Sequence, residues 1–450
     1  MNLLAGSRWQ LVSPGYVWSD MPADRLNGDR EVVIIKAGES AARVVQTPAA
    51  ARQGQSVKIK CRWKGRGALS LSPWVAKNVQ ISANSLTFTW VPDGTLQPIL
   101  YVNETTQSDF VRDLDCREAD ADASRIFTTD YVAQVARYRA VRFMDWQNTN
   151  ANLPVTWATR TTANSGEVIG DDGVSLEYMV ALANQARVDP WFSMPWNADA
   201  DYVRRFAQYV RDNLSPDLQA YVEVSNEVWN WAFKVTSQAD AEGKARGLSQ
   251  VGHPMLMRYA EKTIEDMEIW SDVFKGQTNR IVRVVATQNA WATLSGDIFS
   301  FRDLPNHVDA LATAPYFGVE TEPTQATNLD DFFTNVLPAR ISYTFTSTDT
   351  HKAAAEKYGK RFITYEGGQH LVTQDLDLAR KIQRDPRMGQ MMTRYLQTWD
   401  QRYGDLIMLY ADVGAISKWG AWGIQEFTGQ PASQAPKYAA LMNFLNSIGQ

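Results

Sequence analysis

The chain is organised around the stretch Tyr221-Val-Glu-Val-Ser-Asn-Glu-Val-Trp-Asn230. It begins with a short alternation of apolar residues, which is typical of a buried β-strand. It ends in the pair Asn226-Glu227, followed by the two tryptophans Trp229 and Trp231. A carboxylic acid at the end of a buried strand, beside an amide, suits acid/base chemistry. Whether Glu227 has that role depends on a second carboxylate elsewhere in the chain.

From residue 140 onward, strand-like segments alternate with helix-like ones. Seven segments have the pattern of strands: 140–145, 190–194, the one from Tyr221, 280–286, 308–313, 361–366 and 406–410. Each is followed by a helix or by a segment long enough to contain one. Strands that are apolar on both faces and alternate with helices predict an α/β fold, with a parallel sheet covered by helices.

Two architectures fit this alternation, an open doubly wound sheet of seven strands and a (β/α)8 TIM barrel, which needs an eighth strand. Candidates for that strand lie only near the N-terminus, at Asn2–Ala5 or Trp9–Val12. We predict the barrel, with residues 1–30 contributing its first strand and residues 119–450 the remainder. Short alternating runs separated by Gly and Pro turns predict an inserted antiparallel β-sandwich domain at residues 31–118.

The composition of the chain limits the classes of binding partner that we expect. The 450 residues carry a net charge of −5 with both signs scattered, which disfavours nucleic acid as a partner. The sequence contains no run of 18 apolar residues, so no membrane span is expected. No signal peptide is visible, so a secreted or periplasmic location is expected only if one has been removed.

The 16 Trp and 17 Tyr are typical of a carbohydrate-active protein. Cys61 and Cys116 either pair or stay as two thiols, and the oligomeric state is left open.

In a barrel, the active site lies at the carboxyl ends of the strands. The predicted ends carry these polar residues: Asp145, Asn197, Asn226, Glu227, Gln288, Tyr316, Glu366 and Asp412. The glutamates Glu227 and Glu366 lie on separate strands. A glycosidase uses two such groups, one to protonate the leaving oxygen and one to attack carbon or to activate water. A separation of about 5–5.5 Å implies retention of configuration, and about 6.5–9.5 Å implies inversion.

Asn226-Glu227 after the fourth predicted strand, with Glu366 after the seventh, resembles clan A glycoside hydrolases, the (β/α)8 superfamily that includes cellulases and β-mannanases. The strings 141–146, 189–196 and 223–230 are also similar to bacterial cellulose-binding and cellulase-like proteins, over roughly residues 105–430. The resemblance implies that Glu227 is the acid/base, Glu366 the nucleophile and Asn226 a ligand of the sugar 2-hydroxyl. It also implies that Tyr316 orients the nucleophile and that Trp422 forms the floor of the sugar-binding site.

Other positions have two interpretations each. Arg142 pairs either with Glu366, as an early-strand arginine does in parts of the clan, or with another carboxylate. Asp145 either contacts sugar or caps a helix, and Glu223 is expected to support the site. Trp196 and Trp229 either stack on sugar rings or pack loops against the barrel. His370 either contacts substrate or is a solvated loop residue. Trp146 is a further candidate for sugar contact.

The four histidines lie far apart and no Gly-rich phosphate loop is present, so we expect neither a metal nor a cofactor. The sequence therefore predicts a retaining glycoside hydrolase that cleaves a β-linked glycosidic bond in a poly- or oligosaccharide. That mechanism needs an acid of raised pKa and a nucleophile of lowered pKa. Two alternatives remain: a non-catalytic carbohydrate-binding protein on the same barrel, and a capsule-depolymerising module of a larger assembly.

Overall fold

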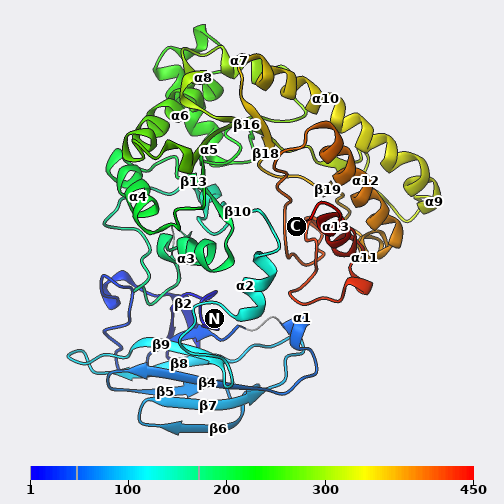
Figure 1. The fold of residues 1–450 in the computed structure, drawn as a ribbon. Coiled ribbons are helices and arrows are strands. Elements are labelled where there is room, and N and C mark those ends of the chain that lie inside the picture. The colour runs from blue at the N-terminus through cyan, green and yellow to red at the C-terminus, as the bar shows by residue number, and fades with distance from the viewer. Residues whose placement is uncertain (1, 47–48, 171–172, 450) are drawn as a thin grey trace. The chain divides into compact units, whose positions relative to one another are not determined.

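The computed structural model describes residues 2–46, 49–170 and 173–449 (Figure 1). The chain divides into two compact units. The N-terminal unit comprises the residues up to Ala133 together with 146–148 and 158–182. The C-terminal unit comprises residues 134–145, 149–157 and everything from Ala183. Among the described residues, no helix has the length and apolar character needed to cross a membrane.

The N-terminal unit holds two antiparallel sheets, of order β2-β1-β3-β8-β5 and β6-β7-β4-β9. Strands β4 and β7 bury alternate residues, and one hydrophobic cluster draws on both sheets, with Ile59, Phe88 and Leu100 among its members. The strands are β1 (Gln10–Ser13), β2 (Val17–Asp20), β3 (Ser40–Val44), β4 (Val57–Lys64), β5 (Gly67–Leu71), β6 (Lys77–Ser82), β7 (Ser85–Trp90), β8 (Ile99–Thr105) and β9 (Arg112–Glu118). The unit also contains helix α1 (Ala49–Arg52) and the short pair β11 (Ile169–Gly170) and β12 (Gly173–Val174).

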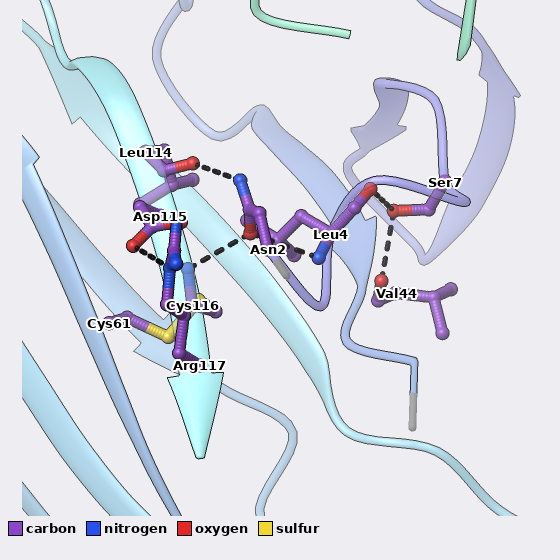
Figure 2. Close-up of a disulfide and its surroundings, with 9 residues drawn as sticks. All are labelled: Asn2, Leu4, Ser7, Val44, Cys61, Leu114, Asp115, Cys116 and Arg117. Carbon is purple, nitrogen blue, oxygen red and sulfur yellow. Dashed lines mark hydrogen bonds and ion pairs between the residues drawn. A yellow bond between two sulfur atoms is a disulfide. The ribbon is translucent and has the colours of Figure 1, made fainter. Parts of the chain in front are cut away.

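The N-terminal residues belong to this unit. Strand β1 pairs antiparallel with β2 and β3, so the prediction that residues 1–30 supply the first barrel strand is wrong. The side chain of Asn2 explains the placement (Figure 2): it donates to the carbonyl of Leu114 and accepts from the amide of Cys116, at 2.9 and 3.0 Å. The unit also runs past the predicted boundary at residue 119.

The C-terminal unit is built on a parallel sheet of six strands, in the order β10-β13-β14-β15-β16-β18. They are β10 (Ala140–Arg142), β13 (Asp189–Met194), β14 (Ala220–Val224), β15 (Ile281–Ala286), β16 (Ala310–Thr313) and β18 (Arg361–Thr364), and a short parallel pair joins β17 (Phe317–Gly318) to β19 (Gln369–His370). Every residue of β13, β14 and β16 is buried, as expected where helices cover a parallel sheet. Six of the seven predicted strands are thus confirmed.

Helices connect these strands, and Figure 1 shows α4, α6, α10 and α12 on the outside of the sheet. Two helices, α2 (Thr129–Val135) and α3 (Leu176–Ala186), cross the boundary between the units. The others are α4 (Ala200–Asn213), α5 (Lys234–Ala245), α6 (Pro254–Val273), α7 (Leu294–Phe299), α8 (Leu304–His307), α9 (Leu329–Asp331), α10 (Leu337–Lys357), α11 (Leu376–Arg384), α12 (Pro386–Arg402) and α13 (Pro436–Ser447).

The seventh predicted strand, 406–410, runs beside β18 without forming a regular ladder. Thr364 donates its amide to the carbonyl of Leu406 at 3.1 Å. Its hydroxyl then takes the place of a backbone partner, because it contacts both the amide and the carbonyl of Met408, at 2.6 and 3.2 Å. Among the described residues, no strand pairs with the free edge of β10, where a closed barrel would have its first strand.

The parallel sheet is nevertheless strongly curved. Strands β10 and β18 are five spacings apart in the order, which would separate them by roughly 24 Å in a flat sheet. Instead, Arg142 at the end of β10 contacts Glu366 just after β18, at 2.8 Å. The six strands therefore form the wall of a partial barrel, with the carboxyl ends of its first and last strands brought together.

Cys61 and Cys116 face each other across β4 and β9 and form a disulfide (Figure 2). We expect the double variant Cys61→Ser/Cys116→Ser to lower the free energy of unfolding of the N-terminal unit by about 2–4 kcal/mol, because a long loop is no longer closed in the unfolded chain. Hydrogen exchange of β4 and β9 peptides measures this locally. The wild type should lose the same protection in reductant, whereas the variant should not respond; equal protection in all samples would contradict the prediction.

Candidate active site

The turn after β14 presents the Asn226-Glu227 pair. The amide of Ser225 still bonds to the carbonyl of Met194, at 2.8 Å, so the parallel ladder persists to that residue. Ser225 and Glu227 then adopt left-handed backbone conformations, with φ of 58° and 42°. These values are uncommon for residues other than glycine and cluster at functional sites. The turn ends the strand abruptly and leaves Asn226 buried beside a half-buried Glu227.

Arg142 lies at the centre of the site, with only 6% of its side chain exposed. Its Nε donates to Glu223 at 2.7 Å, its Nη1 to Glu366 at 2.8 Å and its Nη2 to the side-chain oxygen of Asn226 at 2.9 Å. The guanidinium also lies over the ring of Tyr365, 5.2 Å from its centroid. Arg142 therefore satisfies both interpretations at once, because it pairs with Glu366 and also with Glu223.

Glu366 is held through both carboxylate oxygens. Oε1 accepts from Arg142, and Oε2 accepts from the hydroxyl of Tyr316 at 2.9 Å. Burial raises the pKa of Glu366 from 4.5 to about 7, against the opposing effect of Arg142. This direction is contrary to the lowered pKa expected of a nucleophile. Burial is the largest cause of the raised pKa of Glu366, Arg142 offsets only part of it while also pairing with Glu223, and the charge of Glu227 adds to the rise.

Glu227 has a separate set of partners. Tyr365 contacts its Oε1 at 2.8 Å and Asn230 donates to its Oε2 at 2.7 Å. The amide of Asn230 is oriented by the backbone of Ala232, whose N–H donates to its side-chain oxygen at 3.1 Å. Burial raises the pKa of Tyr365 well above 10, so this phenol stays neutral. Its hydroxyl can pair with either protonation state of Glu227, as donor or as acceptor.

Several supporting residues escape sequence reasoning. Tyr365 precedes Glu366 directly, and an aromatic residue on a strand predicts only core packing. Ser193 donates to Glu223 at 2.7 Å, and Asn150 accepts from the amide of Asn226 at 3.0 Å. Their sequence signal is limited to position: Ser193 lies in register with Glu223 on the neighbouring strand. Glu223, which the sequence suggested as a supporting residue, accepts from both Arg142 and Ser193.

Aromatic and polar side chains form the rim. The indole of half-buried Trp422 donates to Nδ1 of the exposed His370 at 3.1 Å. The ring of His370 lies 5.7 Å from that of Tyr316, and the ring of Tyr410 lies 6.0 Å from that of Trp422. Tyr410 also donates to Asp145 at 3.2 Å. Contacts thus link Trp422, His370 and Asp145, directly or through Tyr410 and Tyr316, to the residues around Glu366.

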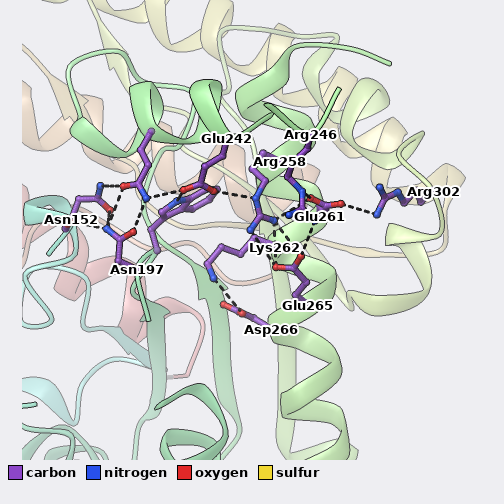
Figure 3. A network of polar contacts seen from close by, with 12 residues as sticks. Asn152, Asn197, Glu242, Arg246, Arg258, Glu261, Lys262, Glu265, Asp266 and Arg302 are labelled. Carbon is purple, nitrogen blue, oxygen red and sulfur yellow. Dashed lines mark hydrogen bonds and ion pairs between the residues drawn. The ribbon is translucent and has the colours of Figure 1, made fainter. Parts of the chain in front are cut away.

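Three predicted tryptophans lie elsewhere. Trp229 is 4% exposed and packs edge-on against Tyr365 and Tyr259. Trp196 is also 4% exposed; its indole donates to Glu242, in the polar network on α5 and α6 drawn in Figure 3, and Arg258 lies over its ring. This burial does not support a stacking role for either ring. Trp146 belongs to the N-terminal unit, where it stacks on Phe127.

Chemically, the arrangement offers two carboxyl groups with independent partners, neutral phenols beside each, and one buried cation. Such a set can protonate a leaving group and supply a carboxylate to an electron-poor carbon. No cluster of three or more His, Cys, Asp or Glu side chains suited to a metal ion occurs within the described part of the chain.

No protein-family model matches the sequence, and a search of curated proteins found no match. Solved structures with some similarity include a GH51 arabinofuranosidase from Xanthomonas axonopodis pv. citri, at 11% identity and a TM-score of 0.44, over 66% of this chain and 63% of that one. A β-glucosidase from Thermotoga maritima has 11% identity and a TM-score of 0.41, over 70% and 85%. GH26C from Muricauda sp. MAR_2010_75 has 10% identity and a TM-score of 0.38, over 68% and 76%.

The chain spans less than two thirds of the length of the arabinofuranosidase.

Replacing Arg142 by methionine should lower the free energy of unfolding by about 3–5 kcal/mol, because two buried carboxylates lose their cation. Urea unfolding measures this. The matched control is Arg139→Met, whose arginine is 63% exposed beside Asp189 and should cost about 1 kcal/mol or less. Adding Glu223→Gln to Arg142→Met should recover part of the loss. Equal costs for the Arg142 and Arg139 variants would contradict the central role of Arg142.

The raised pKa of Glu366 makes a prediction about pH. Its proton is bound more tightly in the folded protein, so its stabilising contribution is complete below pH 4.5 and is lost as pH rises through about 7. Between pH 4 and pH 8, Glu366→Gln should reduce the fall in unfolding free energy by about 3 kcal/mol, at 1.36 kcal/mol per pKa unit. Urea titrations across this range measure it, with the exposed Glu356→Gln as control. Parallel pH profiles for wild type and Glu366→Gln would contradict the shift.

Proposed function

We propose that the C-terminal unit is the catalytic part of a retaining glycoside hydrolase, on a barrel of the (β/α)8 type, that cleaves a β-linked bond in a poly- or oligosaccharide. The observation that carries the proposal is the pair Glu227 and Glu366. They follow two different parallel strands, yet they lie near each other: Tyr365 bonds to Glu227 and directly precedes Glu366, and the charge of Glu227 acts on Glu366. The resemblance to clan A hydrolases assigns the same two residues.

In the first step, an oxygen of Glu366 attacks the anomeric carbon while Glu227 gives its proton to the glycosidic oxygen. The carbon–Glu366 ester bond forms, the glycosidic bond breaks, and the sugar alcohol departs. In the second step, Glu227 takes a proton from water as the water oxygen bonds to the anomeric carbon. The ester bond breaks as the new carbon–oxygen bond forms, and Glu366 leaves as a carboxylate, so the two inversions together retain configuration.

The neighbours of the two acids support these roles. Arg142 and Tyr316 fix the orientation of Glu366, which a nucleophile must keep to lower the entropic part of the barrier. Tyr316 has a pKa well above 10 through burial and the nearby Glu366, so it remains a neutral donor. Glu366 attacks only when ionised. With its pKa near 7, kcat/KM should rise as pH increases through that value.

The rim supplies sugar contacts. The half-buried indole of Trp422 presents a flat apolar surface next to His370. Asn226, oriented by Arg142 and Asn150, offers an amide hydrogen to the 2-hydroxyl of the reacting sugar. Asp145 is exposed at the same rim and can accept from further hydroxyls. A carbohydrate with a free 2-hydroxyl is therefore the substrate class that this set favours.

The test begins with a panel of β-linked polysaccharides and aryl glycosides. On a cleaved substrate, Glu227→Gln should lower kcat by about 10²–10⁴-fold, the usual size of an acid/base contribution. A 2-fluoro glycosyl inhibitor should add its sugar mass to wild type, at the peptide containing Glu366, and nothing to Glu366→Gln. Proton NMR of the first product should show retention.

Three results would sink the proposal: full hydrolysis by Glu366→Gln, an inverted product, or no cleavage and no trapping on any panel member that the wild type binds. The last outcome would instead favour a non-catalytic carbohydrate-binding protein. The exposed Glu356→Gln controls for the effect of a glutamine substitution as such.

A further inference from the structure

A groove unrelated to the two glutamates lies on the five-stranded sheet of the N-terminal unit. Its volume is about 400 Å³, and it is lined by β1, β3, β5, β8 and the adjoining turns. In β8 the side chains alternate: Leu100 and Val102 belong to the shared core, whereas Tyr101 and Asn103 line the groove. Tyr101, Val12 and Ala42 form a separate small cluster beneath it. The groove thus occupies the outer face of the sheet.

Of three exposed aromatic side chains in this region, Tyr16 lines the groove, and Trp74 and Trp18 each lie beside an aromatic residue that lines it. Trp74, in the turn after β5, is 68% exposed, and Tyr16, in the hairpin between β1 and β2, is 59% exposed. Their rings lie 6.4 Å apart, edge to face. Trp18, on β2, is 37% exposed, 6.3 Å from the ring of Tyr101. Neighbouring exposed aromatic rings mark a binding surface more often than scattered apolar residues do.

The floor of the groove is polar and uncharged. Ser40 donates to the side-chain oxygen of Asn103 at 3.0 Å, and the amide of Asn103 donates to Ser70 at 2.9 Å. This row crosses β3, β8 and β5. None of the lining residues is Lys, Arg, Asp or Glu. Burial and the hydroxyl of Tyr16 raise the pKa of Tyr101 to about 12, so its phenol is also neutral. A charged ligand would find no counter-charge here.

The backbone at Tyr16 adds an independent observation. Tyr16 has a φ of 63°, in the left-handed region that glycine or asparagine usually occupies. A bulky residue there costs stability relative to glycine, and Gly15 just before it already provides one such position. The ring of Tyr16 is mostly exposed, so it gains little from burial in return. Burial of the ring therefore does not account for a tyrosine at this turn.

We infer that this groove binds a neutral glycan chain, with Tyr16, Trp18 and Trp74 stacking on sugar rings and the Ser40–Asn103–Ser70 row bonding to hydroxyls. Flat rings beside neutral donors and acceptors match the alternating apolar faces and hydroxyl edges of a sugar. The site belongs to the N-terminal unit and uses none of the proposed catalytic residues. It holds whether or not the C-terminal unit hydrolyses the same polymer.

Native gels containing a soluble polysaccharide test this inference on the full chain. Hydroxyethyl cellulose, xyloglucan, galactomannan, arabinoxylan and laminarin are the neutral probes, and polygalacturonate and alginate are the charged comparisons. Each protein also carries Glu227→Gln to prevent hydrolysis. At least one neutral polymer should retard the protein. Trp74→Ala and Tyr16→Gly should each weaken that retardation about tenfold or more, as loss of a central aromatic anchor usually does.

Controls separate the groove from other surfaces. Tyr343→Ala removes an aromatic side chain of similar exposure, 62%, on α10, and should leave retardation unchanged. Trp422→Ala alters the candidate active site and should leave retardation in place. Because glycine suits a left-handed φ, Tyr16→Gly should unfold no earlier than its parent. Its loss of binding would then not reflect misfolding.

Any of four results would overturn the inference: retardation by no neutral polymer, retardation by charged polymers alone, undiminished binding in both groove variants, or abolition by Trp422→Ala alone. A dimer in gel filtration that Trp74→Ala dissociates, without glycan binding, would assign the groove to contact between copies. Because no step measures hydrolysis, failure here is distinguishable from failure of the proposed catalysis.

Discussion

The buried guanidinium of Arg142 is the constraint on which the C-terminal unit depends. An arginine with 6% exposure cannot be left without partners, because an uncompensated buried charge costs several kcal/mol. Its partners come from three places: Glu223 from strand β14, Asn226 from the turn after β14, and Glu366 from the end of β18. One cation therefore holds together the ends of strands that a flat sheet would keep far apart. The same contacts bring Glu223, Asn226 and Glu366 together in the site.

That sharing also sets the electrostatics. Arg142 faces both Glu223 and Glu366, and Glu227 adds a third carboxyl group nearby. One positive charge shared between Glu223 and Glu366 does not fully offset the burial of Glu366, so the pKa of Glu366 rises to about 7. The phenols of Tyr316 and Tyr365 donate to the two acids without adding charge. A site with a single cation thus has one carboxyl group that titrates close to neutral pH.

Much of the parallel sheet could be predicted from sequence, because strands buried on both faces are continuous apolar runs and their ends are polar. The same reasoning led to Glu227 and Glu366 as the proposed acid and nucleophile. It misplaced β1, since Leu11-Val12 fits either kind of sheet and the antiparallel pairing of β1 with β2 and β3 decides between them. It expected a regular strand at 406–410, because no sequence pattern shows that a threonine hydroxyl will replace a ladder partner.

The tryptophan content shows where composition stops being informative. Sixteen tryptophans suggested carbohydrate binding, yet several, including Trp191 and Trp270, are fully buried and fill the core. Trp196 and Trp229 follow the ends of β13 and β14 but are buried as well. Exposure, which depends on tertiary packing, is what distinguishes a stacking surface from a core residue. By that criterion Trp74, in a segment that matched no known family, is better suited to a sugar ring than Trp229, two residues from the proposed acid.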